Sequence, residues 1–195
     1  IPGLREAGAR LLKVSMTLFP CFPEEKEKFL KSIKCQAGQT GGMKEEAMEK
    51  LLCPSMMCAD FGALKREMEA LEKAGIDLYH LDVMDGKFVP NFGMGLQDIQ
   101  YICGQGKKPA DVHLMIEDPG NYVELFAGLG AKIIYIHPEA DTHPTRTLQR
   151  IIDAGAKPGI AINPGTSIGT VEELLYLSEY VLVMTVNPGF AGQKY

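Results

Sequence analysis

The stretch Tyr79-His-Leu-Asp-Val-Met-Asp-Gly-Lys-Phe-Val-Pro-Asn91 decides which fold we expect. Its first half has the apolar, aromatic and β-branched residues of a strand. His80 and Asp82 nevertheless lie two residues apart within it, and residues two apart in a strand point to the same face. An imidazole and a carboxylate on one face can hold a divalent metal. Because a turn and a loop follow, we expect this pair near the carboxyl end of a strand, the usual position of a site in an α/β protein.

Strand-like runs and helix-like stretches alternate along the chain from residue 50 onward. Such alternation with short connections predicts right-handed βαβ units and a parallel sheet. The apolar, strand-like runs are residues 51–57, 78–84, 110–116, 131–137, 157–163 and 180–186. The stretches with the period of an amphipathic helix are residues 60–75, 121–130, 145–155 and 171–177.

Polar residues inside the strand-like runs favour a (β/α)8 barrel over an open doubly wound sheet, because barrel enzymes draw catalytic groups from several strand ends. No GxGxxG follows the first run, which argues against a dinucleotide-binding fold. A full barrel takes roughly 200 residues or more, and the chain ends at Tyr195, just after the sixth run. We therefore expect a TIM barrel over residues 43–195, truncated after its sixth strand, and an N-terminal extension with a linker over residues 1–42.

The third strand-like run repeats the pattern of the second, because Asp111 and His113 are also two residues apart. Neighbouring strands lie about 4.8 Å apart, so His80, Asp82 and His113 can reach one ion. Two nitrogens with one or two oxygens suit Zn²⁺, Fe²⁺, Mn²⁺ or Co²⁺. Each histidine alone would more simply be a hydrogen-bonded core residue, and the matching spacing on two runs favours the metal site. We do not expect His137 to be a ligand.

A glycine-rich loop, Asn187-Pro-Gly-Phe-Ala-Gly-Gln193, follows the sixth run directly. Glycines at the carboxyl end of a strand can expose backbone N–H groups to a phosphate, and late loops of barrels commonly hold phosphate. A plain flexible turn is the alternative. Ser55, in the first run, is expected to donate a hydrogen bond to a substrate, since nothing marks it as a nucleophile.

Methionines near the ends of several runs form a further group. The general expectation is that these methionines pack in the core. The more specific expectation is that they form a wall that excludes water from a reactive intermediate. The group consists of Met56, Met57, Met84, Met115 and Met184.

Composition argues against several classes of partner. The formal net charge is −5, which provides no basic surface for nucleic acid or an anionic membrane. No apolar run reaches the ~18 residues of a membrane span. The five cysteines form no CxxC pair, and free thiols in a reducing, cytoplasmic compartment fit this odd count. The sequence leaves open whether the protein is a homo-oligomer.

Four segments together resemble the ribulose-phosphate 3-epimerases, in the family's order and at natural spacings, from about residue 49 to residue 195. The segments are Cys53–Phe61, His80–Asn91, Asp111–Met115 and Val183–Gln193. The resemblance implies a (β/α)8 barrel that binds one divalent metal and inverts C3 of a ketose phosphate. Removal of a proton next to a carbonyl gives an enediolate, and inversion needs an acid and a base on opposite faces.

The resemblance also implies roles for single residues. His80, Asp82 and His113 match three of the family's four metal ligands, and Asp82 matches one of its two proton-exchanging carboxylates. Ser55 and His113 match substrate contacts. Part of the phosphate cradle is matched by Gly189, Phe190, Ala191 and Gly192, and the apolar lining by Met84, Met115 and Met184. The family's second catalytic aspartate would lie beyond Tyr195, so the chain on its own is expected to be inactive.

The expected reaction is D-ribulose 5-phosphate to D-xylulose 5-phosphate, in pentose phosphate metabolism. D-Allulose 6-phosphate 3-epimerase is the alternative, because Ser-Met-Met-Cys at 55–58 and Gly-Phe-Ala-Gly-Gln at 189–193 lean toward it. A non-catalytic phosphate-binding module of the same fold is a second alternative. A decarboxylase of the same barrel plan is weaker, since that group would place a lysine where His80 and Asp82 stand.

Overall fold

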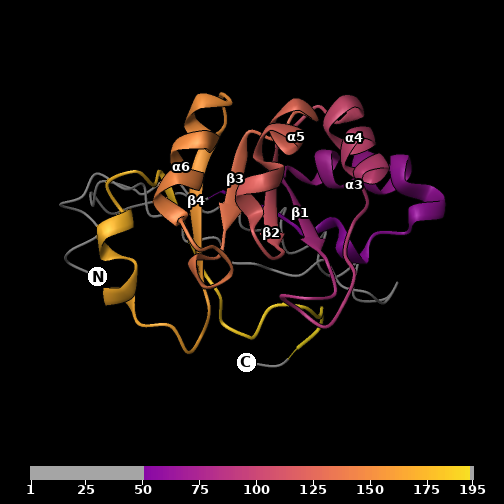
Figure 1. Cartoon of the computed structure of the whole chain (residues 1–195). Helices are drawn as coiled ribbons and strands as arrows, with labels where there is room; N and C mark the ends of the chain where they lie inside the picture. The colour runs from indigo at the N-terminus through magenta and orange to yellow at the C-terminus, as the bar shows by residue number, and fades with distance from the viewer. Residues whose placement is uncertain (1–50, 194–195) are drawn as a thin grey trace, which may run out of the picture.

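Figure 1 shows the computed structural model of the chain, in which residues 51–193 are described. The predicted boundary between residues 1–42 and a domain that begins at residue 43 lies outside these residues and stays a prediction. Within them, five parallel strands form one sheet in the order β1-β2-β3-β4-β5, with helices between successive strands. This is the α/β arrangement of a partial (β/α)8 barrel, so the predicted fold class is confirmed.

Five of the six predicted strands are confirmed, each within the predicted run. Neighbouring strands are also neighbours in sequence, and every pair is parallel, which requires a crossover connection between successive strands. The strands are β1 (Tyr79–Met84), β2 (Ala110–Met115), β3 (Ile133–Ile136), β4 (Lys157–Ile162) and β5 (Tyr180–Val183).

The first predicted strand, over residues 51–57, is wrong as a regular strand. Only Ser55 pairs there, through one isolated parallel bridge to His80, and a 3₁₀ turn, η1 (Met56–Cys58), follows at once. Pro54 has no N–H for a ladder, and the Ser55 hydroxyl accepts from the Met57 N–H at 3.2 Å and so starts the turn. The segment still lies along β1, since the Pro54 carbonyl accepts from the His80 N–H at 3.0 Å.

Three of the predicted helix-like stretches contain α-helices, and a fourth helix, α4, lies outside them. Gly75 ends α3 with a positive φ of 94°, as a C-terminal glycine commonly does. The α-helices are α3 (Leu64–Ala74), α4 (Leu96–Gln105), α5 (Val123–Gly128) and α6 (Pro144–Asp153). The short 3₁₀ turns are η1, η2 (Phe61–Ala63), η3 (Pro119–Tyr122), η4 (Pro138–Ala140), η5 (Ile168–Thr170) and η6 (Glu172–Leu174).

The predicted helix over residues 171–177 is replaced by a 3₁₀ turn, η6. Its backbone bonds join each N–H to the carbonyl three residues earlier, as from Leu175 to Glu172 and from Leu177 to Leu174. A segment this short gains little from helical cooperativity, and 3₁₀ bonding is common in short connectors.

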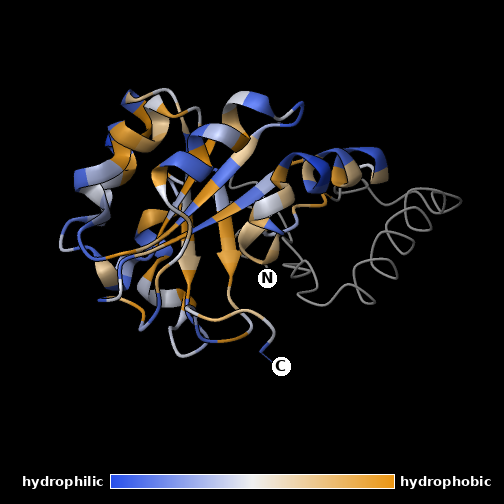
Figure 2. Cartoon of the chain, turned by 90° about the vertical axis from the view of Figure 1, so that its right-hand side faces the viewer, coloured by the Kyte–Doolittle hydropathy of each residue, from blue (hydrophilic) through white to orange (hydrophobic). Residues whose placement is uncertain are grey.

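The two faces of the sheet carry different residues, because side chains alternate along each strand. One face packs against the helices in the main apolar cluster, with Leu81, Val112 and Ile134 among its strand residues. The helices carry hydrophobic and hydrophilic residues on different sides (Figure 2), which suits this packing. The other face, which we call the inner face, carries His80 from β1 and Asp111 opposite it on β2.

The inner face depends on one glycine. Gly159 on β4 lies opposite Tyr135 on β3, and a Cβ added at Gly159 would lie 2.3 Å from Cδ1 of that ring. Only a residue without a side chain leaves room for this ring, which is fully buried beside Tyr180.

The structure bears on two predictions made from composition, the free state of the cysteines and the lack of a membrane span. Cys53 and Cys103 are free thiols, whereas Cys58 is disulfide-bonded, so the expectation of free thiols is wrong for Cys58. None of the helices within residues 51–193 is both long and apolar enough to cross a membrane.

Candidate metal centre

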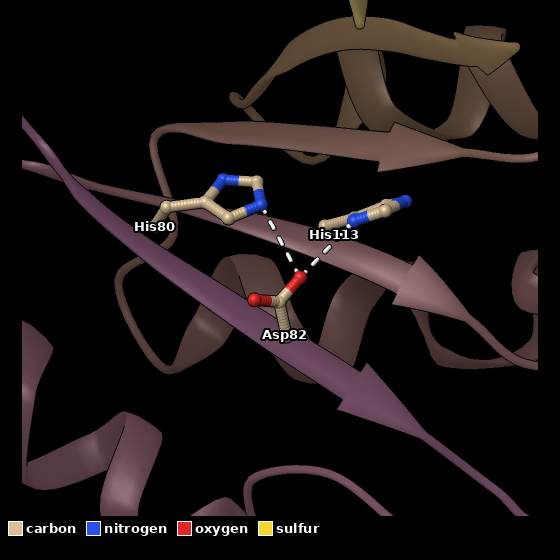
Figure 3. A group of neighbouring side chains, drawn as sticks. All are labelled: His80, Asp82 and His113. Atoms are coloured by element: carbon tan, nitrogen blue, oxygen red, sulfur yellow. Dashed lines mark hydrogen bonds and ion pairs between the residues drawn. The ribbon is translucent and has the colours of Figure 1, made fainter. Parts of the chain in front are cut away.

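Three polar side chains meet on the inner face, where β1 and β2 run side by side (Figure 3). His80 and Asp82 come from β1, and His113 lies opposite Asp82 in the register of β2. All three are buried. Nε2 of His80 lies 3.3 Å from Oδ1 of Asp82, and Nδ1 of His113 lies 3.2 Å from the same oxygen. The strand spacing therefore brings together the three residues that the sequence predicts as metal ligands.

The chemistry of this group fits a divalent ion. One ligand atom from each residue lies within 4.8 Å of the others. Nε2 of His80 is buried without a hydrogen-bond partner among the described residues, and an unpaired buried nitrogen is costly unless something binds it. Two imidazole nitrogens and a carboxylate oxygen suit Zn²⁺, Fe²⁺, Mn²⁺ or Co²⁺. The residues alone do not choose among these metals.

The same residues perturb one another's protonation. Burial alone would raise the pKa of the Asp82 carboxyl, but the charge of His80 and the close approach of the His113 imidazole hold that pKa far below its usual range. Burial would lower the pKa of His80, yet the charges of Asp111 and Asp82 raise it well above its ordinary value. Burial lowers the pKa of His113 to about 4. Asp82 is therefore ionised and His113 neutral at pH 7, the states in which both bind metals.

Each histidine also has a partner on the side away from Asp82. Nδ1 of His80 lies 2.5 Å from Oδ1 of Asp111, so the flanking carboxylate noted in the sequence orients the first imidazole. Nε2 of His113 lies 2.8 Å from Nε2 of His137 at the end of β3. Sequence reasoning passed over His137, although Glu139 two residues later was an available signal. Burial alone would raise the pKa of Glu139, but hydrogen bonds from His137 and Thr166 lower it to about 2.

Ser55 adds a hydroxyl to the group. Its Oγ donates to Oδ2 of Asp82 at 2.5 Å, and the residue is buried. The sequence predicts a contact with substrate for Ser55, and the structure places it against the candidate catalytic carboxylate instead of in open space.

The predicted methionine wall is divided between two clusters. Met84 and Met115 face each other in the register of β1 and β2 and pack with Val89 in a small buried cluster. Met184 is buried too, but it packs with Tyr135 and other inner-face residues of β3 to β5.

The glycine-rich loop after β5 lies against the loop after β1. Nδ2 of Asn91 donates to the Gly189 carbonyl at 2.7 Å. Gly189 and Gly192 have φ values of 121° and 72°, which favour glycine, and Phe190 between them is exposed. Ala191 is half-buried. The predicted phosphate loop and the stretch that carries His80 and Asp82 are thus neighbours in space.

Fold and site together define a barrel-type α/β protein with a candidate metal centre on the inner face of its sheet. The model of the ribulose-phosphate 3 epimerase family matches residues 51–195. The chain belongs to this family.

Curated relatives agree with this assignment. The ribulose-phosphate 3-epimerase of Aquifex aeolicus (strain VF5) is 46% identical over 146 residues, which cover 75% of this chain and 66% of the relative. That of Bacillus subtilis (strain 168) is 45% identical over 144 residues, covering 74% and 66%. The chain spans about two thirds of the length of these relatives.

More distant solved structures share the fold alone. Muconate lactonizing enzyme from Pseudomonas putida superposes with a TM-score of 0.57 at 18% identity, covering 90% of this chain and 45% of that one. β-Methylaspartase from Clostridium tetanomorphum gives 0.59 at 12% identity, covering 96% and 51%.

Proposed function

We propose that the whole protein is a metal-dependent epimerase that converts D-ribulose 5-phosphate to D-xylulose 5-phosphate by proton transfer at C3. The observation that carries the proposal is the buried convergence of His80, Asp82 and His113 on the inner face of a barrel of this family. The division into residues 1–42 and 43–195 and the cytoplasmic location stay predictions from sequence.

The ion would be held by His80, Asp82 and His113. A bound divalent metal supplies positive charge that stabilises a developing enediolate by several kcal/mol. Asp82 is the group that we assign to remove the proton from C3, since the neighbouring imidazoles keep its carboxylate ionised. Ser55 holds the second oxygen of that carboxylate and so fixes its orientation. Proton transfer by a positioned side chain contributes roughly 10²–10⁴-fold in rate.

Other inner-face residues would bind the substrate and keep water out. We assign Met84, Met115 and Met184 to the apolar wall, because all three are buried near the carboxyl ends of their strands. We assign residues 189–192 to the phosphate, because their positive-φ glycines can turn backbone N–H groups toward an anion. The partner is accordingly a small ketose phosphate.

Exchange of the C3 proton tests this function more sensitively than product formation does. Purified protein loaded with Zn²⁺, Mn²⁺, Fe²⁺ or Co²⁺ is incubated in D₂O with D-ribulose 5-phosphate, and deuterium at C3 and D-xylulose 5-phosphate are followed by NMR. We expect metal-dependent exchange that is lost in Asp82→Asn. Protein that binds metal yet neither exchanges nor epimerises this sugar or D-allulose 6-phosphate would refute the enzyme and favour the non-catalytic module.

The two sugars are separated in the same experiment. The segment at 55–58 and Ala191 in the glycine-rich loop are the residues that favour a hexulose phosphate over a pentulose phosphate as the substrate. Faster exchange with D-allulose 6-phosphate at equal concentrations would replace the leading substrate and leave the site and chemistry unchanged.

A further inference from the structure

A chain of polar contacts leads from the candidate metal centre through His137 to Glu139. His113 and His137 are both fully buried, and their ring centroids lie 4.9 Å apart. Nδ1 of His137 lies 3.6 Å from Oε2 of Glu139. Glu139 is held from its other side, since its Oε1 accepts from Oγ1 of Thr166 at 2.5 Å and from the N–H of Asn163 at 3.3 Å.

The distances fix an order of protons along this chain. The two Nε2 atoms of His113 and His137 are 2.8 Å apart, so one of them carries a proton and the other accepts it. An ionised carboxylate at Glu139 favours a proton on the facing Nδ1 of His137, because a lone pair there would be repelled. Nε2 of His137 is then the acceptor, and the shared proton sits on Nε2 of His113.

This order leaves Nδ1 of His113 without a proton, and Nδ1 is the nitrogen that faces Asp82 at 3.2 Å. The reverse order would put a proton on the nitrogen that a metal needs and a lone pair of His137 against Glu139. Glu139 therefore favours, through one intervening ring, the tautomer of His113 that can bind an ion, whereas the Asp82 carboxylate at 3.2 Å favours the reverse tautomer until an ion binds Nδ1.

We propose that His137 and Glu139 are positioning residues that hold His113 in its metal-binding tautomer. The proposal rests on the metal centre of the proposed function. Ligating histidines in proteins usually donate their other N–H to a carboxylate, carbonyl or water, and loss of that partner typically lowers metal affinity by 10–100-fold. Here the donation goes to a second imidazole, whose own N–H faces the carboxylate.

Metal affinity of the full-length protein tests the role of Glu139, whose side chain is 25% exposed. Calorimetric titration of the metal-free protein with Zn²⁺ should give about 10–100-fold weaker binding for Glu139→Ala. Glu139→Gln should retain part of the affinity, because its amide oxygen still accepts from Nδ1–H. The control is Glu117→Gln, which removes the same charge from the same hollow but contacts Lys87.

The protonation sites of His113 and His137 can also be measured directly, and a purely structural role of Glu139 would not determine them. In ¹⁵N-labelled, Zn²⁺-loaded protein, long-range ¹H–¹⁵N spectra should show His137 protonated on Nδ1 and His113 on Nε2. A proton on Nε2 of His137, or wild-type affinity in Glu139→Ala, would overturn this proposal while leaving the epimerase proposal intact. Wild-type protein that binds no Zn²⁺ would overturn both.

Discussion

Gly159→Ala is the substitution whose effect the geometry of the inner face determines most closely. The added Cβ would lie 2.3 Å from Cδ1, 2.7 Å from Cε1 and 3.0 Å from Cγ of Tyr135. These are atoms of the ring body, so no flexible end can move aside. The ring is also flanked on both sides, with centroid separations of 6.4 Å to His80 and 6.4 Å to Tyr180.

The expected cost is that of overpacking a buried site, roughly 1–3 kcal/mol of unfolding free energy. That range corresponds to roughly a 5- to 150-fold change in the folding equilibrium, since about 1.4 kcal/mol is tenfold. Because Tyr135 can yield only toward its neighbours, displacement of the His80 ring should also weaken Zn²⁺ binding.

Urea unfolding provides the assay, with a lower midpoint and an unchanged slope as the expected result. Gly104→Ala in α4 is the matched control, because its Cβ would meet nothing within 4 Å and alanine favours a helix by up to about 1 kcal/mol. Adding Tyr135→Val should recover much of the loss in Gly159→Ala, as a double-mutant cycle would reveal. A Gly159→Ala protein within about 0.5 kcal/mol of wild type, a usual range for surface changes, would refute the reasoning.

Three further predictions follow from the same contacts. In metal-free protein, burial lowers the pKa of His113 to about 4 from 6.5. Between these values the unfolded chain binds a proton at His113 that the folded chain does not bind, so the free energy of unfolding should fall by about 3 kcal/mol from pH 7 to pH 4. The urea midpoint should fall less over this range in His113→Gln, and an equal fall would contradict this prediction. Asn91→Ala removes the 2.7 Å bond to the Gly189 carbonyl, worth about 1 kcal/mol, and should raise KM several-fold with little change in kcat; an unchanged KM would exclude a role in phosphate binding. The Tyr135 hydroxyl is buried with no hydrogen-bond partner in the described part of the chain, so Tyr135→Phe should leave the urea midpoint unchanged or raised, and a loss above about 1 kcal/mol would indicate a missed partner.

The parallel sheet and the metal-ligand group follow from local patterns in the sequence. Spacing of two residues places His80 and Asp82 on one face of a strand, and the same spacing in the next strand brings His113 opposite Asp82. Both steps need only strand geometry and the adjacency of consecutive strands, which explains why sequence alone predicts them.

The errors arise where local conformation or tertiary contact decides the outcome. A run of apolar residues suggested a strand around Ser55, but the preceding proline and the hydroxyl cap produced a turn. The N-cap of helix α4 is Gly95, which has no side-chain oxygen; Asp98 three residues on accepts from the Gly95 N–H instead. His137 joins the site because strand β3 ends beside His113, and the carboxylate of Glu139 two residues later was the one local signal that sequence reasoning did not use.

The location of a bound ion tests the central claim most directly. A crystal of the protein grown with Zn²⁺ is measured at the zinc absorption edge, and the anomalous difference map locates the metal. The account predicts one peak among Nε2 of His80, Oδ1 of Asp82 and Nδ1 of His113, lost in crystals of His113→Gln. A peak bound by other residues, or none in protein saturated with Zn²⁺, would contradict it.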